Sequence, residues 1–212
     1  MAAVVGVVVA LGIAVGVTYL LTSKKATPTA TVPTTQPVHH STVVHDKAAK
    51  ARATTTTTTT ARAEEQIAAR ALSALLTQSV VDRSDITNAS NDVSSCGPTL
   101  ANDAKTFETA AASRQSLLSE LSGLTDESTL PPTMIQTLTM AWQASEQVDD
   151  DYSSWASAEY AQGCVPDDTS NPYFQAAGTP NTQATQYKQN FVNAWNPIAT
   201  EYGLATYQWD QL

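Results

Sequence analysis

Two cysteines are the residues of this 212-residue chain whose chemistry is easiest to predict, Cys96 and Cys164. Each stands beside a glycine at the end of a stretch with helical spacing, in the dipeptides Cys96-Gly97 and Gly163-Cys164. A pair of cysteines forms a disulfide, remains as two reduced thiols, or contributes to a metal site. Two thiolates without a nearby histidine fill only half of a tetrahedral zinc site, so a metal is the least favoured outcome. We expect a disulfide between Cys96 and Cys164, with two buried reduced thiols as the alternative.

Residue types that commonly act in catalysis are scarce in the segment 62–212. This segment contains no histidine, which removes the usual general base and the commonest metal ligand. A serine or threonine nucleophile would need activation by a lysine or a carboxylate, and neither Lys105 nor Lys188 lies in a recognisable motif. The segment has no Glu-x-x-His pair and no glycine-rich phosphate loop. We therefore predict no enzymatic activity, no catalytic residues, no metal and no cofactor.

The remaining candidates for chemistry are carboxylates. Asp149, Asp150 and Asp151 form the most acidic run. Consecutive residues of a helix point about 100° apart, so these three side chains do not converge on one ion, and we expect them on a solvated face. Asp103 and Glu108 are candidates for a carboxylate-dependent hydrolase, the weakest functional hypothesis, because it needs two acids facing one cleft.

The element that must position these groups most directly is a long predicted helix between Leu130 and Cys164. It contains no proline or glycine from residue 133 to residue 162. Residues of one face recur at steps of three and four, which indicates an amphipathic helix whose aromatic stripe is buried. The stripe consists of Ile135, Leu138, Trp142, Ser145, Val148, Tyr152, Trp155 and Glu159.

Three further stripes predict three more helices. Glycine, with proline beyond it, ends the first at Gly97-Pro98, and a glycine ends the second and the last. Pro197 falls inside the last and is expected to kink it. The first stripe is Leu72, Leu75, Leu76, Ser79, Asp82, Arg83, Ile86, Ala89, Val93 and Cys96. The second is Leu100, Ala104, Phe107, Ala111, Arg114, Leu118 and Leu121, and the last is Ala184, Tyr187, Phe191, Ala194, Trp195, Ile198 and Tyr202.

Four helices of roughly 23 to 35 residues, joined mostly by short turns, predict an all-α, up-down-up-down four-helix bundle. In that topology the first and third helices end at the same end of the bundle, which brings Cys96 and Cys164 together. A disulfide closing such a loop is worth about 4 kcal/mol in the chain-entropy model. The helix pattern and the cysteine positions are separate observations, so their agreement supports the topology.

The N-terminal part has a different character. Residues 2–21 carry no charge and are long enough to cross a bilayer as a helix, so we predict a transmembrane anchor over residues 1–22. Gly12 and Gly16 match a weak motif for helix dimers in membranes. A stretch rich in Thr and Pro, 23–61, follows and is predicted to be a disordered linker. The domain at 62–212 follows the linker.

Two features give opposite indications of the orientation in the membrane. Lys24 and Lys25 follow the span and favour a cytoplasmic C-terminus by the positive-inside rule. The Thr/Pro linker and the paired cysteines are typical of exported proteins. We expect a single-pass plasma-membrane protein whose C-terminal domain lies outside the cytoplasm.

The charge of the domain limits its partners. From Arg62 onward there are six basic and nineteen acidic residues, against a net charge of −9 for the whole chain. Such an acidic domain repels phosphate backbones, so nucleic-acid binding is not expected. An envelope component or a basic protein is the favoured partner, beside the membrane itself. The oligomeric state stays open.

The combination of an N-terminal span, a Thr/Pro linker and the two Cys-Gly pairs resembles a known type of protein. Further points of likeness are Phe191-Val-Asn-Ala-Trp-Asn-Pro-Ile198 and Tyr202-Gly203-Leu204. Together they resemble uncharacterised single-pass membrane-anchored helical proteins of high-GC Gram-positive (actinobacterial) bacteria. The likeness covers roughly 62–204, and this resemblance implies no established activity.

The sequence therefore favours a membrane-tethered, extracytoplasmic helical bundle that acts in protein or cell-envelope interaction. The alternative is a bundle that senses a small molecule bound between helices near Trp195, Asn196 and Pro197. That alternative predicts a cavity beside Trp195.

Overall fold

The computed structural model describes residues 47–212, with side chains from residue 59 onward. The predicted anchor at 1–22, its glycines Gly12 and Gly16, and the linker up to residue 46 lie outside the described residues. Within the part that is described, no helix has both the length and the apolar character needed to span a membrane.

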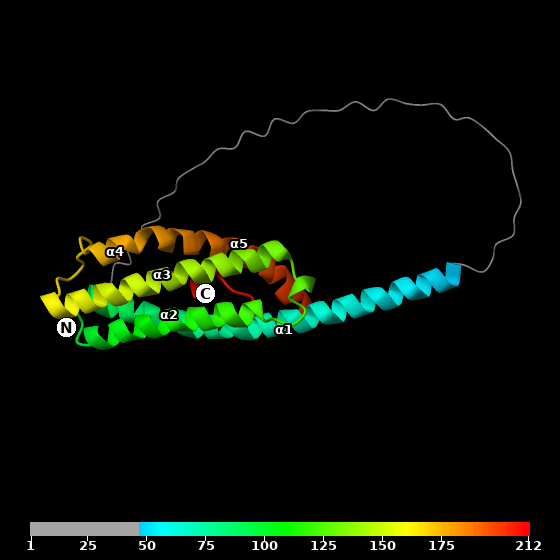
Figure 1. Cartoon of the computed structure of the whole chain (residues 1–212), viewed down its shortest axis with the longest axis horizontal. Coiled ribbons are helices and arrows are strands. Elements are labelled where there is room, and N and C mark those ends of the chain that lie inside the picture. The colour runs from blue at the N-terminus through cyan, green and yellow to red at the C-terminus, as the bar shows by residue number, and fades with distance from the viewer. Residues whose placement is uncertain (1–46) are drawn as a thin grey trace, which may run out of the picture. The chain divides into compact units, whose positions relative to one another are not determined.

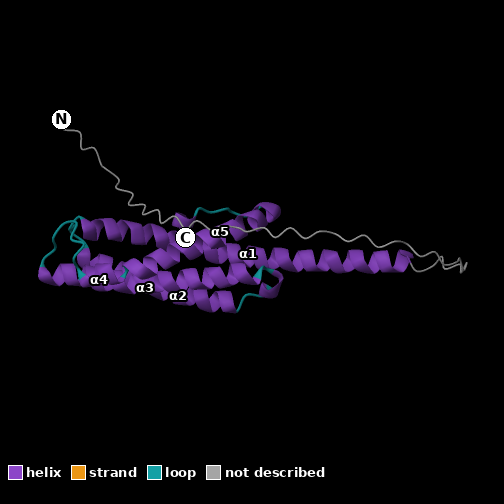
Figure 2. Cartoon of the chain, turned by 90° about the horizontal axis from the view of Figure 1, so that it is seen from above, coloured by secondary structure: helices purple, strands orange, loops and turns teal. Residues whose placement is uncertain are grey.

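Four long helices make up the described chain: α1 (Lys47–Ser94), α2 (Leu100–Ser122), α3 (Pro132–Gln162) and α5 (Gly178–Tyr202). They are joined by the short helix α4 (Pro172–Ala176) and a 3-10 turn at Glu127–Thr129, and a second 3-10 turn lies at Trp209–Gln211. Figure 1 shows α1 and α3 running in one direction and α2 and α5 in the other. Figure 2 shows helices throughout this part, with loops at their ends and no strand. The predicted all-α fold is confirmed.

Backbone geometry explains where the helices end. The amide of Gly97 donates to the carbonyl of Asp92 at 2.8 Å, and a Cβ on Gly97 would overlap the Asp92 carboxylate, so a larger residue here would displace the Asp92 side chain. At the end of α5, Gly203 is left-handed with φ of 65°. Leu204 donates to the carbonyl of Ala199 at 2.8 Å, which is a Schellman end.

The start of α1 differs from the sequence-based prediction. The helix begins at Lys47 and continues through the seven threonines, within the stretch 23–61 that was predicted to be a disordered linker. Alanine, lysine and arginine between residues 47 and 53 have high helix propensity. Because helix growth is cooperative once a turn has formed, a run of weaker helix formers between two stronger segments remains helical.

Two apolar clusters fill the bundle. The larger cluster draws on α1, α2, α3, α5 and the C-terminal tail, and includes Leu72, Leu76, Leu117, Leu121, Met134, Leu138, Trp142, Phe191, Trp195 and Leu212. The smaller cluster lies toward the Cys96–Cys164 end and consists of Ile86, Ala89, Val93, Ala104, Phe107, Ala110, Trp155 and Ala156. On α1, α2 and α3 a short segment with buried polar residues separates the two clusters.

Candidate functional site

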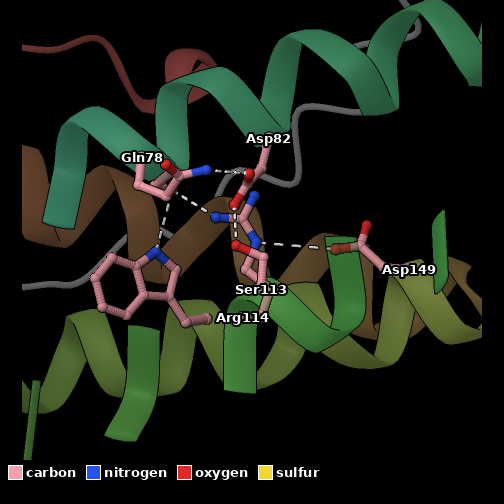
Figure 3. A network of polar contacts seen from close by, with 7 residues as sticks. Gln78, Asp82, Ser113, Arg114 and Asp149 are labelled. Carbon is pink, nitrogen blue, oxygen red and sulfur yellow. Dashed lines mark hydrogen bonds and ion pairs between the residues drawn. The ribbon is translucent and has the colours of Figure 1, made fainter. Parts of the chain in front are cut away.

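A layer of buried polar side chains lies between the two apolar clusters. We define the polar layer as Ser79 of α1, Arg114 of α2, Ser145 and Asp149 of α3, and Lys188 of α5. None of the five is more than 8% exposed, and Arg114 is fully buried. Because α1 and α3 run opposite to α2 and α5, these positions come to the same level of the bundle. Figure 3 shows the part of the layer around Arg114.

Arg114 is at the centre of this layer but is incompletely paired. Its Nη1 donates to Ser79 Oγ at 2.5 Å, and the same oxygen accepts from Trp142 Nε1 at 3.2 Å. Its Nε lies 3.8 Å from Asp149 Oδ2, which is an ion pair but too long for a hydrogen bond. Among the described residues, Arg114 Nε, Arg114 Nη2, Ser145 Oγ and Asp149 Oδ2 have no hydrogen-bond partner.

A second carboxylate stands at the rim of the layer, where it joins α1 to α2. Asp82 accepts from Ser113 Oγ at 2.7 Å and from Gln78 Nε2 at 2.9 Å. Figure 3 shows both bonds as dashed lines at the Asp82 carboxylate. Asp82 is therefore satisfied by neutral donors and adds negative charge on one side of Arg114.

Burial moves the pKa values of Asp149 and Lys188 in the polar layer toward neutral pH. Burial raises the pKa of Asp149 to about 7, although Arg114 and Lys188 act in the opposite direction. Burial also lowers the pKa of Lys188 to about 7, and the charges of Arg114 and Arg83 add to this shift. The pKa of Arg114 is lowered by burial, against the attraction of Asp149. Asp149 and Lys188 are thus poised to change charge near pH 7.

A small cavity opens beside these groups. Its volume is about 20 Å³, and its lining is Arg83, Ile86, Arg114, Ser145, Val148, Asp149, Asn181, Ala184 and Lys188. A space of this size holds roughly one water molecule, so it cannot admit an organic substrate. The polar layer can therefore hold a proton, a water or a monatomic ion.

A pair of carboxyl groups lies near the turn that joins α1 to α2, at the disulfide end of the bundle. Asp92 of α1 and Asp103 of α2 line one groove of about 360 Å³. Burial raises the pKa of Asp103 to about 6, with the hydrogen bond and charge of Asp92 adding to it. The hydrogen bond from the Thr99 hydroxyl lowers the pKa of Asp92. The two carboxyl groups therefore favour sharing one proton.

The hydrolase hypothesis requires two acids that face one cleft. Asp103 meets this condition with Asp92 in place of Glu108. Asp103 faces the groove with Asp92, whereas Glu108 is exposed and does not line that groove. Asp92 Oδ2 accepts from the Thr99 hydroxyl at 2.7 Å and from the Thr99 amide at 3.2 Å. These bonds close the turn between α1 and α2, which gives the pair a structural role. A catalytic role stays a prediction.

The disulfide prediction is confirmed. Cys96 and Cys164 are bonded, with their Cα atoms 5.6 Å apart. The bridge ties the end of α1 to the end of α3, as the alternating direction of the helices predicts. Asp167 supports the junction, since its amide donates to the carbonyl of Ser94 at 2.8 Å.

The predicted binding region at the α5 proline anchors the C-terminal tail. Trp195 is fully buried, and its Nε1 donates to the carbonyl of Ala205 at 3.0 Å. The Asn196 side chain pairs with both the amide and the carbonyl of Tyr207, each at 3.0 Å. Neither the small cavity nor the groove at Asp92 is lined by Trp195, Asn196 or Pro197. A ligand at this place stays a prediction.

The sequence-based interpretation of the acidic run was wrong for Asp149. Asp149 is 2% exposed and faces Arg114, while Asp150 lies on the exposed side. A signal for the polar layer existed in the stripes, since Ser79, Arg114 and Ser145 occupy apolar positions of three helices. Lys188 continues the spacing of α5, four residues after Ala184.

The comparisons with known proteins add no assignment. No family model, no curated protein and no solved structure matches the chain. The resemblance to actinobacterial membrane-anchored proteins therefore stays a prediction. Among the described residues, no group of three histidine, cysteine or acidic side chains is placed to hold a metal ion.

Proposed function

We propose that the chain is a membrane-tethered, extracytoplasmic helical bundle that contacts a basic protein or envelope component. The observation that carries the proposal is the Cys96–Cys164 disulfide. Disulfides persist in oxidising compartments and are rare in the cytosol, so the bridge favours the outward orientation over the one that Lys24 and Lys25 favour. The proposal assigns no catalytic role to the domain.

The disulfide end of the bundle is the proposed contact surface. Three large apolar side chains of this end are exposed: Tyr160 by 66%, Val165 by 60% and Tyr173 by 45%. Exposed aromatic side chains of this kind are common in protein interfaces. Asp167 and Asp168 lie in the same loop and favour a partner with positive charge.

The direction of α1 supports this choice of surface. The predicted membrane segment precedes α1, and the disulfide follows its other end. A helix of 48 residues spans about 70 Å at 1.5 Å per residue. The disulfide end is therefore the end of α1 farthest along the chain from the predicted anchor.

The location is tested by labelling thiols on intact cells with a membrane-impermeant maleimide. We expect labelling of Cys96 and Cys164 only after a reductant is added to the intact cells. Free thiols that react only after lysis would place the domain in the cytoplasm and contradict the proposal.

The contact surface is tested by placing a photo-crosslinking amino acid at Tyr173 in the full-length chain. The matched control is the same substitution at Val81, which is 53% exposed on the side of α1. We expect a defined crosslinked species from Tyr173 and none from Val81. Equal crosslinking at both positions, or none at either, would contradict the disulfide end as the contact surface.

A further inference from the structure

The charges around the small cavity do not balance. Arg83 of α1, Arg114 of α2 and Lys188 of α5 line it from three helices, together with Asp149 of α3 as its only carboxylate. Asp82 stands nearby and is bonded to Ser113 and Gln78. While Lys188 is protonated, the three cations outnumber the two carboxylates, and at least one positive charge is left without compensation. A buried excess charge is costly unless a counter-ion accompanies it.

The hydrogen-bond donors of the cavity are also in excess. Two donors of the fully buried Arg114 guanidinium, Nε and Nη2, have no partner among the described residues. The Ser145 hydroxyl, 5% exposed, has none either, and the Asp149 Oδ2 acceptor is also unpartnered, so the unpartnered donors outnumber the unpartnered acceptors. No described acid lies within ion-pair distance of Lys188; the ion pairs of the described residues are Arg114–Asp149 and Arg62–Glu201. An acceptor that carries negative charge would satisfy these groups.

The size of the cavity limits what that acceptor is. A volume of about 20 Å³ admits one non-hydrogen atom and excludes phosphate, sulfate or a carboxylate ligand. A water molecule fits and would accept hydrogen bonds, but it would leave the net charge unchanged. A halide ion supplies both the acceptor and the missing charge.

We propose that the polar layer binds one monatomic anion, with chloride as the physiological species, between Arg114, Lys188 and Ser145. The side chains come from α2, α3 and α5, so the anion joins three helices at the level where apolar packing is interrupted. Arg83, which is half-buried, and the exposed Asn181 line the cavity from the solvent side and mark the route of entry. The site is separate from the proposed contact surface at the disulfide end.

The direct test is chloride-35 NMR on the full-length chain in detergent micelles. Exchange between free and bound chloride broadens the chloride signal in proportion to the protein concentration. We expect broadening with the wild-type chain that bromide abolishes by competition and sulfate does not. Absence of broadening would overturn the proposal and leave water as the occupant.

Variants locate the site. Lys188→Met and Arg114→Met each remove one cation of the cavity and are expected to abolish the broadening. The matched control is Arg70→Met, which removes an exposed cation of α1. Broadening that survives Lys188→Met would place the chloride elsewhere and overturn the proposal.

A volume variant keeps the test informative if the charge variants do not fold. Ala184→Val fills the cavity and leaves every charge in place, because Ala184 is buried and lines it. We expect it to abolish chloride broadening in a folded chain. Persistence of the signal in this variant would also overturn the proposal.

Thermal unfolding supplies a second readout that does not depend on NMR. Sodium chloride is compared with sodium gluconate at equal ionic strength. At chloride concentrations about 100-fold above its Kd, the wild-type Tm is expected to rise by roughly 5–10 °C, and Lys188→Met is expected to show no chloride-specific rise. Identical Tm values in the two salts would contradict the site. The maleimide result has no bearing on either measurement, so the two proposals fail independently.

Discussion

The two ends of the bundle are stabilised in different ways. At the end where α5 finishes, the larger cluster receives side chains from all four long helices and the C-terminal tail. At the disulfide end, α5 contributes no residue to the smaller cluster, and half-buried side chains such as Tyr152 and Phe174 pack at its edge. A covalent bond stands at the end with less apolar burial.

This difference shows how the fold divides its stability. Burial of apolar surface stabilises by roughly 25 cal/mol per Å², so the larger cluster supports its end without a crosslink. The smaller cluster is made of three helices with Phe174 of α4 at its edge. The disulfide closes the chain between Cys96 and Cys164, which includes α2 and α3, and so restricts the unfolded state. Burial of the polar layer between them costs desolvation.

The largest effect on stability is expected from substitutions at a matched pair of buried phenylalanines, one in each apolar cluster. Phe191 of the larger cluster and Phe107 of the smaller one are both fully buried. We expect Phe191→Ala to lower the free energy of unfolding by about 3–5 kcal/mol. Phe107→Ala is expected at the low end of this range, because the ring of Tyr152, 5.5 Å away, is able to move into the space.

Urea unfolding followed by circular dichroism measures both variants. Equal losses, or a larger loss for Phe107→Ala, would show that the disulfide end is packed as tightly as the other.

Removal of the disulfide is the next largest effect. Cys96→Ser with Cys164→Ser opens a loop with a sequence separation of 68, and we expect a loss of about 4 kcal/mol in the chain-entropy model. Amide exchange should also become faster near Ile86–Val93 than near Leu72–Leu76, because the smaller cluster opens first.

Hydrogen exchange by mass spectrometry resolves the two parts of α1. The oxidised wild-type chain is the control. A uniform increase of exchange along α1 would contradict the division of stability between the two ends.

We expect the polar layer to make the free energy of unfolding depend on pH, and this effect is of intermediate size. Because the folded pKa of Asp149 is raised to about 7, the folded state binds the proton more tightly, and its contribution to stability falls as pH rises from about 4 to 7. The lowered pKa of Lys188 acts in the opposite direction above pH 7. The groups that face Asp149 are Arg114 and Lys188, with Asp82 and Arg83 beyond them.

We expect Asp149→Asn to remove a slope of about 1.4 kcal/mol per pH unit at most between pH 5 and 6.5. Unfolding free energies in chloride-free buffer measure it, and Asp150→Asn on the exposed side is the matched control. The same slope in the wild type and Asp149→Asn would show that Asp149 is solvated in the folded chain.

The sequence allowed the helices and the disulfide to be predicted because both depend on local signals. Apolar spacing defines a helix, and a Gly-Pro pair or a lone glycine ends it, so the positions of Cys96 and Cys164 follow from topology. The polar layer was missed for a physical reason. Ser79 and Arg114 occupy stripe positions, but spacing alone does not say that polar residues of different helices meet at one level.

The buried Asp149 and the Asp92–Asp103 pair show the same limit of prediction from sequence. Asp149 lies in a run of three acids, and such a run does not indicate which member turns inward; that depends on Arg114 from another helix. The pairing of Asp92 with Asp103 depends on the turn at Gly97, whose geometry is set by a close approach that the sequence does not display.

The smallest effect on stability is expected at an exposed ion pair, in contrast to the buried pair of Arg114 and Asp149. Arg62 and Glu201 join α1 to α5 at 2.6 Å, but their side chains are 66% and 48% exposed. Exposed pairs contribute about 0–1 kcal/mol because water and salt screen them, so Arg62→Ala is expected to lower stability by less than about 1 kcal/mol. Unfolding at low and high salt measures this, and the loss should shrink further as salt rises. A loss that is larger, or that does not depend on salt, would mean that this end relies on the pair as well as on burial. Arg114→Met is the opposite case, because it leaves the Asp149 carboxylate buried without its partner.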